Sequence, residues 1–424
     1  MSLKPFSFIH AADLHLDSPF KGITAEAPFV ADKLRSATFD AYESLIKLCI
    51  EKEVNFLLIA GDVYDGADRS LRAQLKFRDG LERLRQNNIG SYVVHGNHDP
   101  LDGWSSAIEL PQGAHRFGYS KVETVTFNLR DTPAASVSGI SFQKKNEQRN
   151  FARLYSKNDL LPDTFNIGLL HCSVGLNPAH ETYAPCELKD LTKAGIDYWA
   201  LGHVHEKAIM NKDPYVVYPG NTQGRNIREQ GERGCYLVNV DEERNVEMEF
   251  IALDAVRWFS ISVSIDGLET IDQLDRSISN SIYSLKEEAE PRHVVCRINL
   301  IGRGPLYKDL QRESAVVELK ERLRDNYASD DPFVWVEKIK IECRPEFDIE
   351  SLRKNKDFLG QVLSISEEIR VSERTIDEVM GEVFSELYKN RRVEKAIPLP
   401  STDELMDMLR EAELFCIDKL EADE

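Results

Sequence analysis

The first 250 residues alternate between short apolar runs and longer segments of helical period, and this alternation constrains the fold more than any other feature. It is the pattern of a layered α/β fold. Apolar side chains recur at spacings of three and four over residues 33–52 and 71–84, which predicts a helix in each segment. The predicted strands cover residues 6–12, 56–60, 91–94, 134–141, 167–170, 198–201, 215–218 and 235–240.

Beyond Asp254 the apolar pattern changes largely to period two, which predicts strands of a separate small α+β domain. Its expected elements are strands at 258–265, 293–300 and 334–341 and helices at 271–288 and 313–326. From Glu350 onward the sequence is helical in period and highly charged. We therefore expect three domains, at residues 1–253, 254–348 and 349–424.

Five polar motifs in the first domain each follow directly on an apolar run, and their sequences are AADLH, LLIAGD, HGNHD, GLLHC and ALGHVH. A single aspartate or histidine at a strand end is more often a capping group than a metal ligand. Five such motifs along the chain, three of them with a tight glycine, instead favour metal ligands. Open α/β sheets place their active sites at the carboxyl ends of strands. The candidate ligands are Asp13, His15, Asp62, Asn97, His171, His203 and His205.

Imidazole nitrogen combined with carboxylate and amide oxygen suits Mn²⁺, Fe or Zn²⁺. Seven such groups exceed what one ion uses, so we expect two divalent ions, with Mn²⁺ as the first choice. A shared carboxylate screens the repulsion between two dications, and Asp62, alone in its motif, is the candidate for this bridge. On an extended backbone, Asp13 would lie on the same side as His15, and His203 on the same side as His205.

Five further histidines are expected to lie outside the metal site. His10 and His95 fall within strand runs and are predicted to be buried, near the ligands or in the core. His115, His180 and His293 are predicted to be solvated loop or strand positions. Because His180 follows a motif loop, contact with substrate is the alternative for this residue.

Charge and composition limit the class of protein. The net charge of −19 opposes tight unassisted binding to nucleic acid or anionic membranes, without excluding DNA as a substrate. We see no apolar run long enough to span a membrane and no secretory signal at the N-terminus. The seven cysteines are scattered, without a CxxC pair, which favours a reduced cytoplasmic protein.

With these motifs in view, the chain resembles the calcineurin-like metallophosphoesterases, and more narrowly their DNA-repair nuclease branch, the SbcD type. The segments FIHAADLHLDSPF, GDVYDGADRS and YPGNTQGR are most similar to the bacterial YhaO proteins of that branch. The specific resemblance covers about residues 5–250. It implies an α/β/β/α fold, a β-sandwich flanked by helices, followed by a smaller α+β capping domain and a helical, acidic C-terminal region.

The resemblance also implies roles for individual residues. One ion would be held by Asp13, His15, Asp62 and His205, and the other by Asp62, Asn97, His171 and His203. His98 would contact the scissile phosphate and act as an acid toward the leaving group. Asp65 matches the acid that steadies this histidine in many relatives, although some nuclease relatives carry a histidine there.

The sequence is compatible with three functions. The leading one is a nuclease acting on DNA ends with an SbcC-like coiled-coil ATPase, which in the resembling branch binds the C-terminal helices. The second is a small-molecule phosphoesterase with the same metal site, and the third is a scaffold without catalysis, which the complete ligand set makes the weakest. Six basic residues are candidates for phosphate contacts, with simple solvation at the surface as the alternative. They are Lys144, Lys145, Arg149, Arg153, Arg225 and Arg228.

The C-terminal region carries an apolar stripe of its own. Residues 405–420 present Leu405, Met408, Leu409, Ala412 and Phe415 at spacings of three or four. Such a stripe either packs on its own domain or docks on helices of a partner. The sequence leaves open both this choice and whether the protein forms a homodimer.

Overall fold

In a computed structural model of the chain, the described residues are 3–18, 28–65, 70–102, 108–157, 160–175, 182–371 and 402–420. Contacts divide the chain into two compact units. The first comprises Met1–Gly302 and Lys308–Cys343, and the second comprises Arg303–Tyr307 and Arg344–Glu424. Within the described ranges, no helix combines the length and apolar character needed to cross a membrane.

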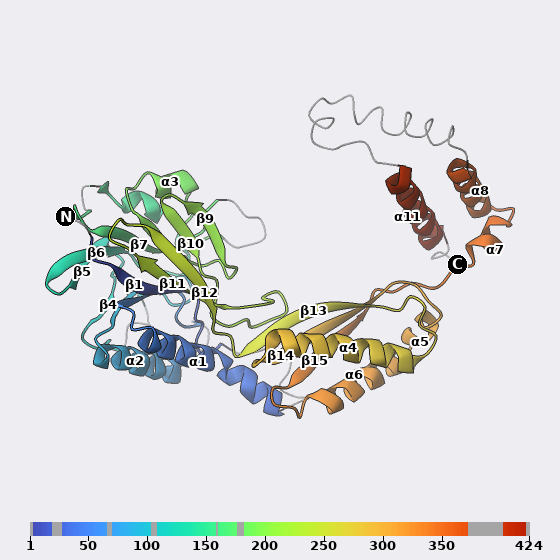
Figure 1. The fold of residues 1–424 in the computed structure, drawn as a ribbon, viewed down its shortest axis with the longest axis horizontal. Helices are drawn as coiled ribbons and strands as arrows, with labels where there is room; N and C mark the ends of the chain where they lie inside the picture. Colours follow the sequence, from blue (N-terminus) through green and yellow to red (C-terminus); the bar gives the residue numbers. More distant parts are fainter. Residues whose placement is uncertain are drawn as a thin grey trace, which may run out of the picture. The chain divides into compact units, whose positions relative to one another are not determined.

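A six-stranded sheet in the first unit carries two long helices on one face (Figure 1). Strands β1 to β4 are parallel, and β11 runs antiparallel to both of its neighbours. In spatial order the strands are β12 (Val246–Ala252), β11 (Gly234–Val240), β1 (Phe6–Ala11), β2 (Phe56–Ala60), β3 (Gly90–Val94) and β4 (Ala114–Arg116). The helices are α1 (Pro28–Glu51) and α2 (Leu71–Gln86).

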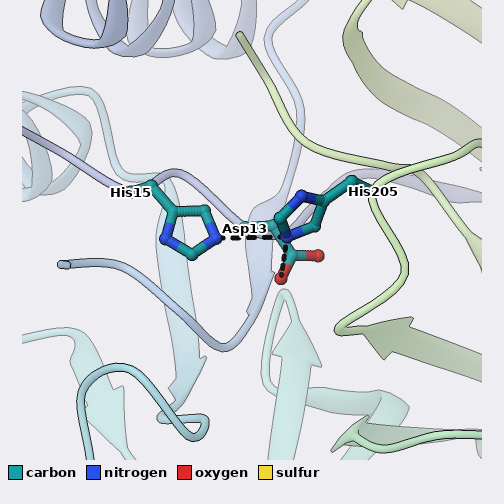
Figure 2. Close-up of side chains that lie close together, drawn as sticks. All are labelled: Asp13, His15 and His205. Carbon is teal, nitrogen blue, oxygen red and sulfur yellow. Dashed lines mark hydrogen bonds and ion pairs between the residues drawn. The ribbon is translucent and has the colours of Figure 1, made fainter. Parts of the chain in front are cut away.

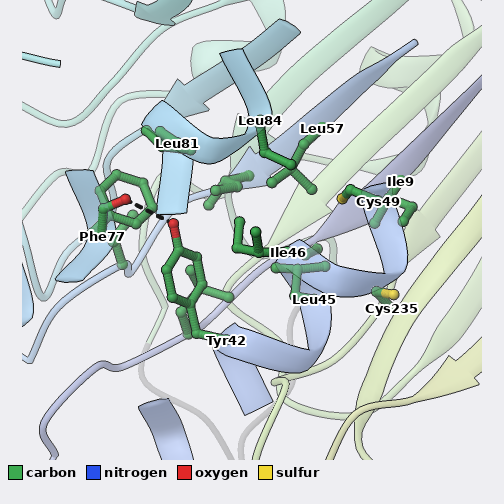
Figure 3. Close-up of a cluster of buried hydrophobic side chains, with 14 of the residues drawn as sticks. Ile9, Tyr42, Leu45, Ile46, Cys49, Leu57, Phe77, Leu81, Leu84 and Cys235 are labelled. Carbon is green, nitrogen blue, oxygen red and sulfur yellow. Dashed lines mark hydrogen bonds between the residues drawn. The ribbon is translucent and has the colours of Figure 1, made fainter. Parts of the chain in front are cut away.

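Alternate residues of the central strands point to opposite faces of this sheet. Ile9 and Leu57 pack against the helices α1 and α2, where the Tyr42 hydroxyl donates a 2.8 Å hydrogen bond to the Phe77 carbonyl (Figure 3). The preceding residue of β1, Phe8, faces the second sheet instead. Both faces are therefore buried, which explains why these strands are continuously apolar in sequence.

The second sheet also has six strands, and its inner face packs on the first sheet through a shared apolar core. In spatial order the strands are β5 (Glu123–Leu129), β6 (Thr132–Gly139), β7 (Phe165–His171), β8 (Tyr198–Gly202), β10 (Tyr215–Tyr218) and β9 (Ala208–Lys212). The helix α3 (Leu188–Thr192) and the 3₁₀ turn η2 (Phe151–Leu154) pack on its outer face around Trp199. The four layers confirm the predicted sandwich of two sheets flanked by helices.

A third, three-stranded parallel sheet belongs to the same unit, and we call residues 254–302 and 308–343, which surround it, the cap. Its strands are β13 (Val256–Ser264), β14 (His293–Ile301) and β15 (Val334–Ile341), with helices α4 (Ile271–Ala289), α5 (Tyr307–Leu310) and α6 (Glu313–Tyr327) between them. Trp258 of β13 and Trp335 of β15 pack in one apolar cluster with Leu34 of α1. This cluster joins the cap to the first sheet's helical layer.

The second unit is helical, as predicted for the C-terminal region. Its helices are α7 (Ile349–Arg353), α8 (Phe358–Val371) and α11 (Thr402–Leu420). Leu363 of α8 and Ile417 of α11 are fully buried in their common core. The predicted stripe on α11 is divided, since Leu405 is buried whereas Met408 and Phe415 are exposed.

Every predicted strand and helix of the first two domains is present, with ends within five residues of the prediction. Four strands were not predicted: β4, β5, β9 and β12. All four are short or partly exposed strands at sheet edges, so their sequences lack a continuous apolar run.

Replacement of Leu45 by alanine tests the packing of α1 on the first sheet. Leu45 is fully buried, so Leu45→Ala should lower the free energy of unfolding by about 2–5 kcal/mol. Leu71→Ala, at an exposed position on α2, is the matched control and should change it by less than about 0.5 kcal/mol. Urea denaturation followed by circular dichroism measures both, and equal losses would contradict the packing described.

Candidate metal centre

The seven candidate ligands come from strand ends of both sheets. Residues Asp13 and His15 follow β1, and Asp62 and Asn97 follow β2 and β3 of the same sheet. From the second sheet, His171 ends β7, and His203 and His205 follow β8. Packing of the two sheets against each other brings these ends together, so the ligands from one sheet face those from the other.

One group of three ligand atoms lies on the side of β1. Single ligand atoms of Asp13, His15 and His205 all lie within 4.8 Å of one another. The His15 and His205 Nε2 atoms are 3.3 Å apart, and His205 Nε2 is 3.9 Å from Asp13 Oδ1 (Figure 2). This group has the donor atoms and the spacing of a cation site.

A second group lies around His171. Ligand atoms of Asp13, Asp62 and His171 also lie within 4.8 Å of one another. The His171 Nε2 atom is 3.0 Å from Asn97 Oδ1 and 3.5 Å from Asp62 Oδ2. Because the same Asp62 oxygen is 3.9 Å from His15 Nε2, this carboxylate lies between the two groups.

The position of His203 relative to the second group is defined by its ring and its backbone. The ring centroids of His203 and His171 are 5.2 Å apart. The His203 backbone N–H donates to both carboxylate oxygens of Asp13, at 3.0 and 3.1 Å. The structure thus brings all seven predicted ligands into one region.

Hydrogen bonds on the outer nitrogens orient two of the histidine rings. His171 Nδ1 is 2.9 Å from the carbonyl oxygen of Ala60, to which it can only donate. His205 Nδ1 lies 2.8 Å from Glu229 Oε1 and donates to that carboxylate. In the neutral imidazole the Nε2 of each ring then carries a lone pair directed at the other ligands, which is the form that binds a metal ion.

The backbone at the ligands differs from the extended form that the sequence predicted. Asp13, His15, Asp62 and His203 have φ angles of 52°, 42°, 49° and 99°. Positive φ is uncommon for residues other than glycine and costs free energy, so it persists where the surroundings impose it, as at functional sites. The pairs converge because the chain turns at these residues, and the predicted period-two geometry is wrong.

Gly96 leaves the space that Asp62 and His171 occupy in the second group. A Cβ atom added at this position would meet the Asp62 carboxylate and the His171 ring. Any side chain here would displace both ligands. This close approach explains the glycine of the HGNHD motif.

The buried carboxylates of the site need positive charge nearby to be stable. Asp13 and Asp62 are almost fully buried, each with 1% of its surface exposed. Burial, and next the negative charge of Asp62, raise the pKa of Asp13 well above its usual value. Two buried carboxylates beside lone pairs of several imidazoles are unfavourable unless cations neutralise them, so the residues present fit a dinuclear divalent-metal site.

His98 and Asp65 form a pair next to these ligands. The His98 backbone N–H donates to Asp62 Oδ1 at 2.9 Å, and its ring Nδ1 lies 3.2 Å from Asp65 Oδ1. Burial acts to lower the pKa of His98, but the hydrogen bond with Asp65 and the charge of Asp62 outweigh it and raise that pKa. The hydrogen bond from His98 in turn lowers the pKa of Asp65 to about 2. His98 can therefore carry a proton while its side chain stays 35% exposed.

The sequence prediction assigned no role to two acids that support this site. Asp99 accepts hydrogen bonds from the Gly96 and Val63 backbone N–H groups and lies 2.9 Å from His95 Nδ1, which holds the HGNHD loop. Glu229 is 24 residues beyond His205, its partner at the metal site. Burial acts to raise the pKa of Glu229, but the hydrogen bond from His205 helps to lower it to about 2. The HGNHD motif signalled Asp99, whereas no local pattern signalled Glu229.

The structure gives separate outcomes for the other histidines. His10 and His95 are fully buried, as predicted. His115 is partly exposed and 3.3 Å from Glu123, and His293 is half-buried and stacks on Phe333. The predicted position of His180 lies outside the described residues.

The six candidate phosphate-binding residues differ in exposure and in their ion pairs. Arg149 and Arg153 are engaged by Glu147 and Asp190. Among the other four, Lys144, Lys145 and Arg228 are exposed, while Arg225 is mostly buried beside Asp65 and Glu229.

Comparison with known proteins finds relatives among the phosphoesterases. Residues 6–207 match the family model "Calcineurin-like phosphoesterase", and residues 258–344 match "Metallophosphoesterase YhaO, middle domain". The chain is 35% identical to the uncharacterized metallophosphoesterase YhaO of Bacillus subtilis over 351 residues, which are 82% of this chain and 85% of that one. The chain therefore belongs to the calcineurin-like metallophosphoesterases, and within them it groups with YhaO.

More distant relatives have names that state a function. The chain is 24% identical to the DNA double-strand break repair protein Mre11 of Thermoplasma acidophilum, over 69% of this chain and 76% of that one. It is 23% identical to the Mre11 of Sulfurisphaera tokodaii, over 85% of this chain and 89% of that one. These matches extend well beyond the 202 residues of the phosphoesterase match.

Exchange of the shared carboxylate tests the metal centre. Asp62→Asn removes the negative charge between the two ligand groups, so binding of Mn²⁺ should weaken at both sites by at least about 10-fold. Titration calorimetry with Mn²⁺ measures this loss. The control Asp102→Asn, at an exposed position in the loop after β3, should bind as the wild type does. Loss at one site alone would show that Asp62 is not shared.

Proposed function

We propose that this protein is a two-metal phosphodiesterase that cleaves DNA, with Asp62 as the carboxylate shared by both ions. The position of Asp62 between His15 and His171 is the observation that carries the proposal. The first ion would be held by one ligand set and the second by another. These sets are Asp13, His15, Asp62 and His205 for the first, and Asp62, Asn97, His171 and His203 for the second.

The residues around the ligands fit hydrolysis of a phosphodiester. When bound, two such ions make a nucleophile available from water near neutral pH and neutralise charge on the phosphate oxygens. His98 has a raised pKa and a partly exposed side chain, so it can donate a proton to the departing oxygen. Asp65 orients the His98 ring through Nδ1 and leaves Nε2 for that proton transfer.

A DNA substrate is supported by the relatives and by the length of the similarity. The Mre11 proteins that match are named for the repair of DNA double-strand breaks, and the matches cover 69% and 85% of this chain. The alternative is a small phosphoester such as a nucleotide, because the same metal site would serve it. Comparison of end-labelled linear DNA, circular single-stranded DNA and bis-p-nitrophenyl phosphate with Mn²⁺ separates these substrates.

The nature of the ion and the compartment are part of the proposal. Four imidazoles, two carboxylates and one amide suit Mn²⁺, with Fe and Zn²⁺ as alternatives. All seven cysteines are free, which agrees with a reducing cytoplasm.

A partner is proposed because charge alone would keep DNA away. At a net charge of −19, unassisted binding to DNA should be weak and steeply dependent on salt. The second unit exposes Met408 and Phe415 on α11, which could contact a coiled-coil ATPase of the SbcC type.

The proton-donor role predicts a separation between metal binding and turnover. His98→Ala should lower the turnover of DNA by at least about 10-fold, because the departing sugar oxygen loses its acid. Binding of Mn²⁺ should stay within a few-fold of the wild type, since His98 is not one of the seven proposed ligands. Loss of metal binding together with turnover would instead make His98 a ligand.

The C-terminal region can be tested by truncation. Deletion of the residues after Pro398 should leave hydrolysis of bis-p-nitrophenyl phosphate unchanged, because every proposed ligand lies in the first unit. The same deletion should weaken association with a co-expressed SbcC-type ATPase and slow the cleavage of long DNA. A pull-down that recovers equal ATPase with both proteins would remove α11 from this role.

A further inference from the structure

One segment of the first unit contacts both the metal centre and the cap. We call residues 221–231 the linking segment; it follows β10 and contains the conspicuous sequence NTQGRNIREQG. Its first three residues are almost completely buried, and Glu229 is buried as well. Buried polar side chains in an irregular segment require specific partners, and the partners lie in two different places.

Toward the metal centre, the linking segment contacts His205 and Asp65, two residues with proposed functional roles. Glu229 Oε1 accepts the hydrogen bond from His205 Nδ1. Arg225 reaches the Ser18 hydroxyl at 3.3 Å and the Asp65 carboxylate at 3.7 Å. The segment thus contacts a proposed metal ligand on one side and the partner of His98 on the other.

The two charged residues of the linking segment are also fixed relative to each other. Glu229 Oε2 accepts the Arg225 backbone N–H at 2.7 Å and the Asn221 side-chain amide at 3.1 Å. The contacts of the Arg225 guanidinium are longer, from 3.3 to 3.7 Å. Glu229 is therefore the more tightly bonded of the two side chains. It also fixes the Arg225 backbone, on which the position of the guanidinium depends.

Toward the cap, the linking segment is bonded along β13. The Gln223 side chain donates to the Val256 carbonyl at 2.6 Å and accepts from the Ala255 N–H at 2.8 Å. The Trp258 indole N–H donates to the Gly224 carbonyl at 2.9 Å. A Cβ at Gly224 would meet the Glu229 carbonyl at 2.6 Å and the Trp258 ring at 3.1 Å, so this contact requires glycine.

We propose that Glu229 and Arg225 are positioning residues of the metal centre, and that strand β13 of the cap fixes their place through Gln223 and Gly224. Glu229 holds the His205 ring with Nε2 toward the ligands, and Arg225 holds Asp65 beside His98. The cap is then a structural part of the active site, and a shift of β13 changes the ligand geometry. This inference rests on the proposed function, because it assigns His205 and Asp65 the roles given there.

The contact with Glu229 is tested by metal affinity rather than by activity. Glu229→Ala should weaken Mn²⁺ binding at one of two sites by about 10- to 100-fold in titration calorimetry, since such partners fix ligand orientation. Glu229→Gln keeps an acceptor for His205 Nδ1 and should recover most of the loss. Unchanged affinity in a folded Glu229→Ala protein would overturn the role of Glu229.

The contact with the cap is tested by a matched pair of tryptophan variants. Trp258→Phe removes the indole N–H bound to Gly224 and keeps an aromatic ring in the cluster. Trp335→Phe makes the same change in the same cluster, but the Trp335 indole N–H has no hydrogen-bond partner among the described residues. Trp258→Phe should lower kcat for bis-p-nitrophenyl phosphate by about 2- to 30-fold with little change in KM, whereas Trp335→Phe should stay within about 2-fold.

A double variant separates coupling from general destabilisation. Trp258→Phe alone should weaken Mn²⁺ binding at the site that Glu229→Ala affects, and in the Glu229→Ala background it should cause no further loss, because both changes act on the same segment. Equal effects of the two tryptophan variants, or additive losses in the double variant, would overturn the coupling. An inactive wild type that still shows the metal-affinity pattern would refute the phosphodiesterase proposal and leave the positioning role of Glu229 standing.

Discussion

The burial of Asp13 and Asp62 side by side is the constraint on which the rest of the centre depends. Two carboxylates removed from water repel each other and lose hydration, so the site is unfavourable unless positive charge compensates them. The surroundings supply oriented imidazole lone pairs, since the outer nitrogens of His171 and His205 are bonded to Ala60 and Glu229. A pair of divalent ions satisfies both requirements at once, and this makes the fold of the first unit a scaffold for a dinuclear metal site.

The architecture explains how so many polar groups reach one place. In each sheet the candidate ligands lie at the carboxyl ends of parallel strands. The apolar core between the two sheets packs them against each other and so brings these strand ends together. Positive φ at four ligands then turns the chain so that side chains from neighbouring positions converge. The bonds from Gln223 and Trp258 to the linking segment extend this scaffold into the cap, beyond the sandwich itself.

The sequence predicted those features that depend on local pattern. Fully buried strands such as β2 were predicted to the residue because both of their faces are apolar, and the candidate ligands stood out in sequence because each lies at the end of such a strand. Edge strands such as β12, half exposed and rich in glutamate, carried no comparable pattern. The role of Glu229 depends on a contact across 24 residues, and the turns at Asp13 and His15 depend on tertiary packing, so neither could be derived from spacing.

Anomalous diffraction from crystals grown with Mn²⁺ shows whether two cations share the Asp62 carboxylate. Shared binding would give two anomalous peaks about 3.5–4 Å apart, on either side of Asp62. One peak should lie near His15 and His205, and the other near Asn97 and His171. A single peak, or peaks that leave Asp62 without a metal contact, would show that Asp62 does not bridge two ions.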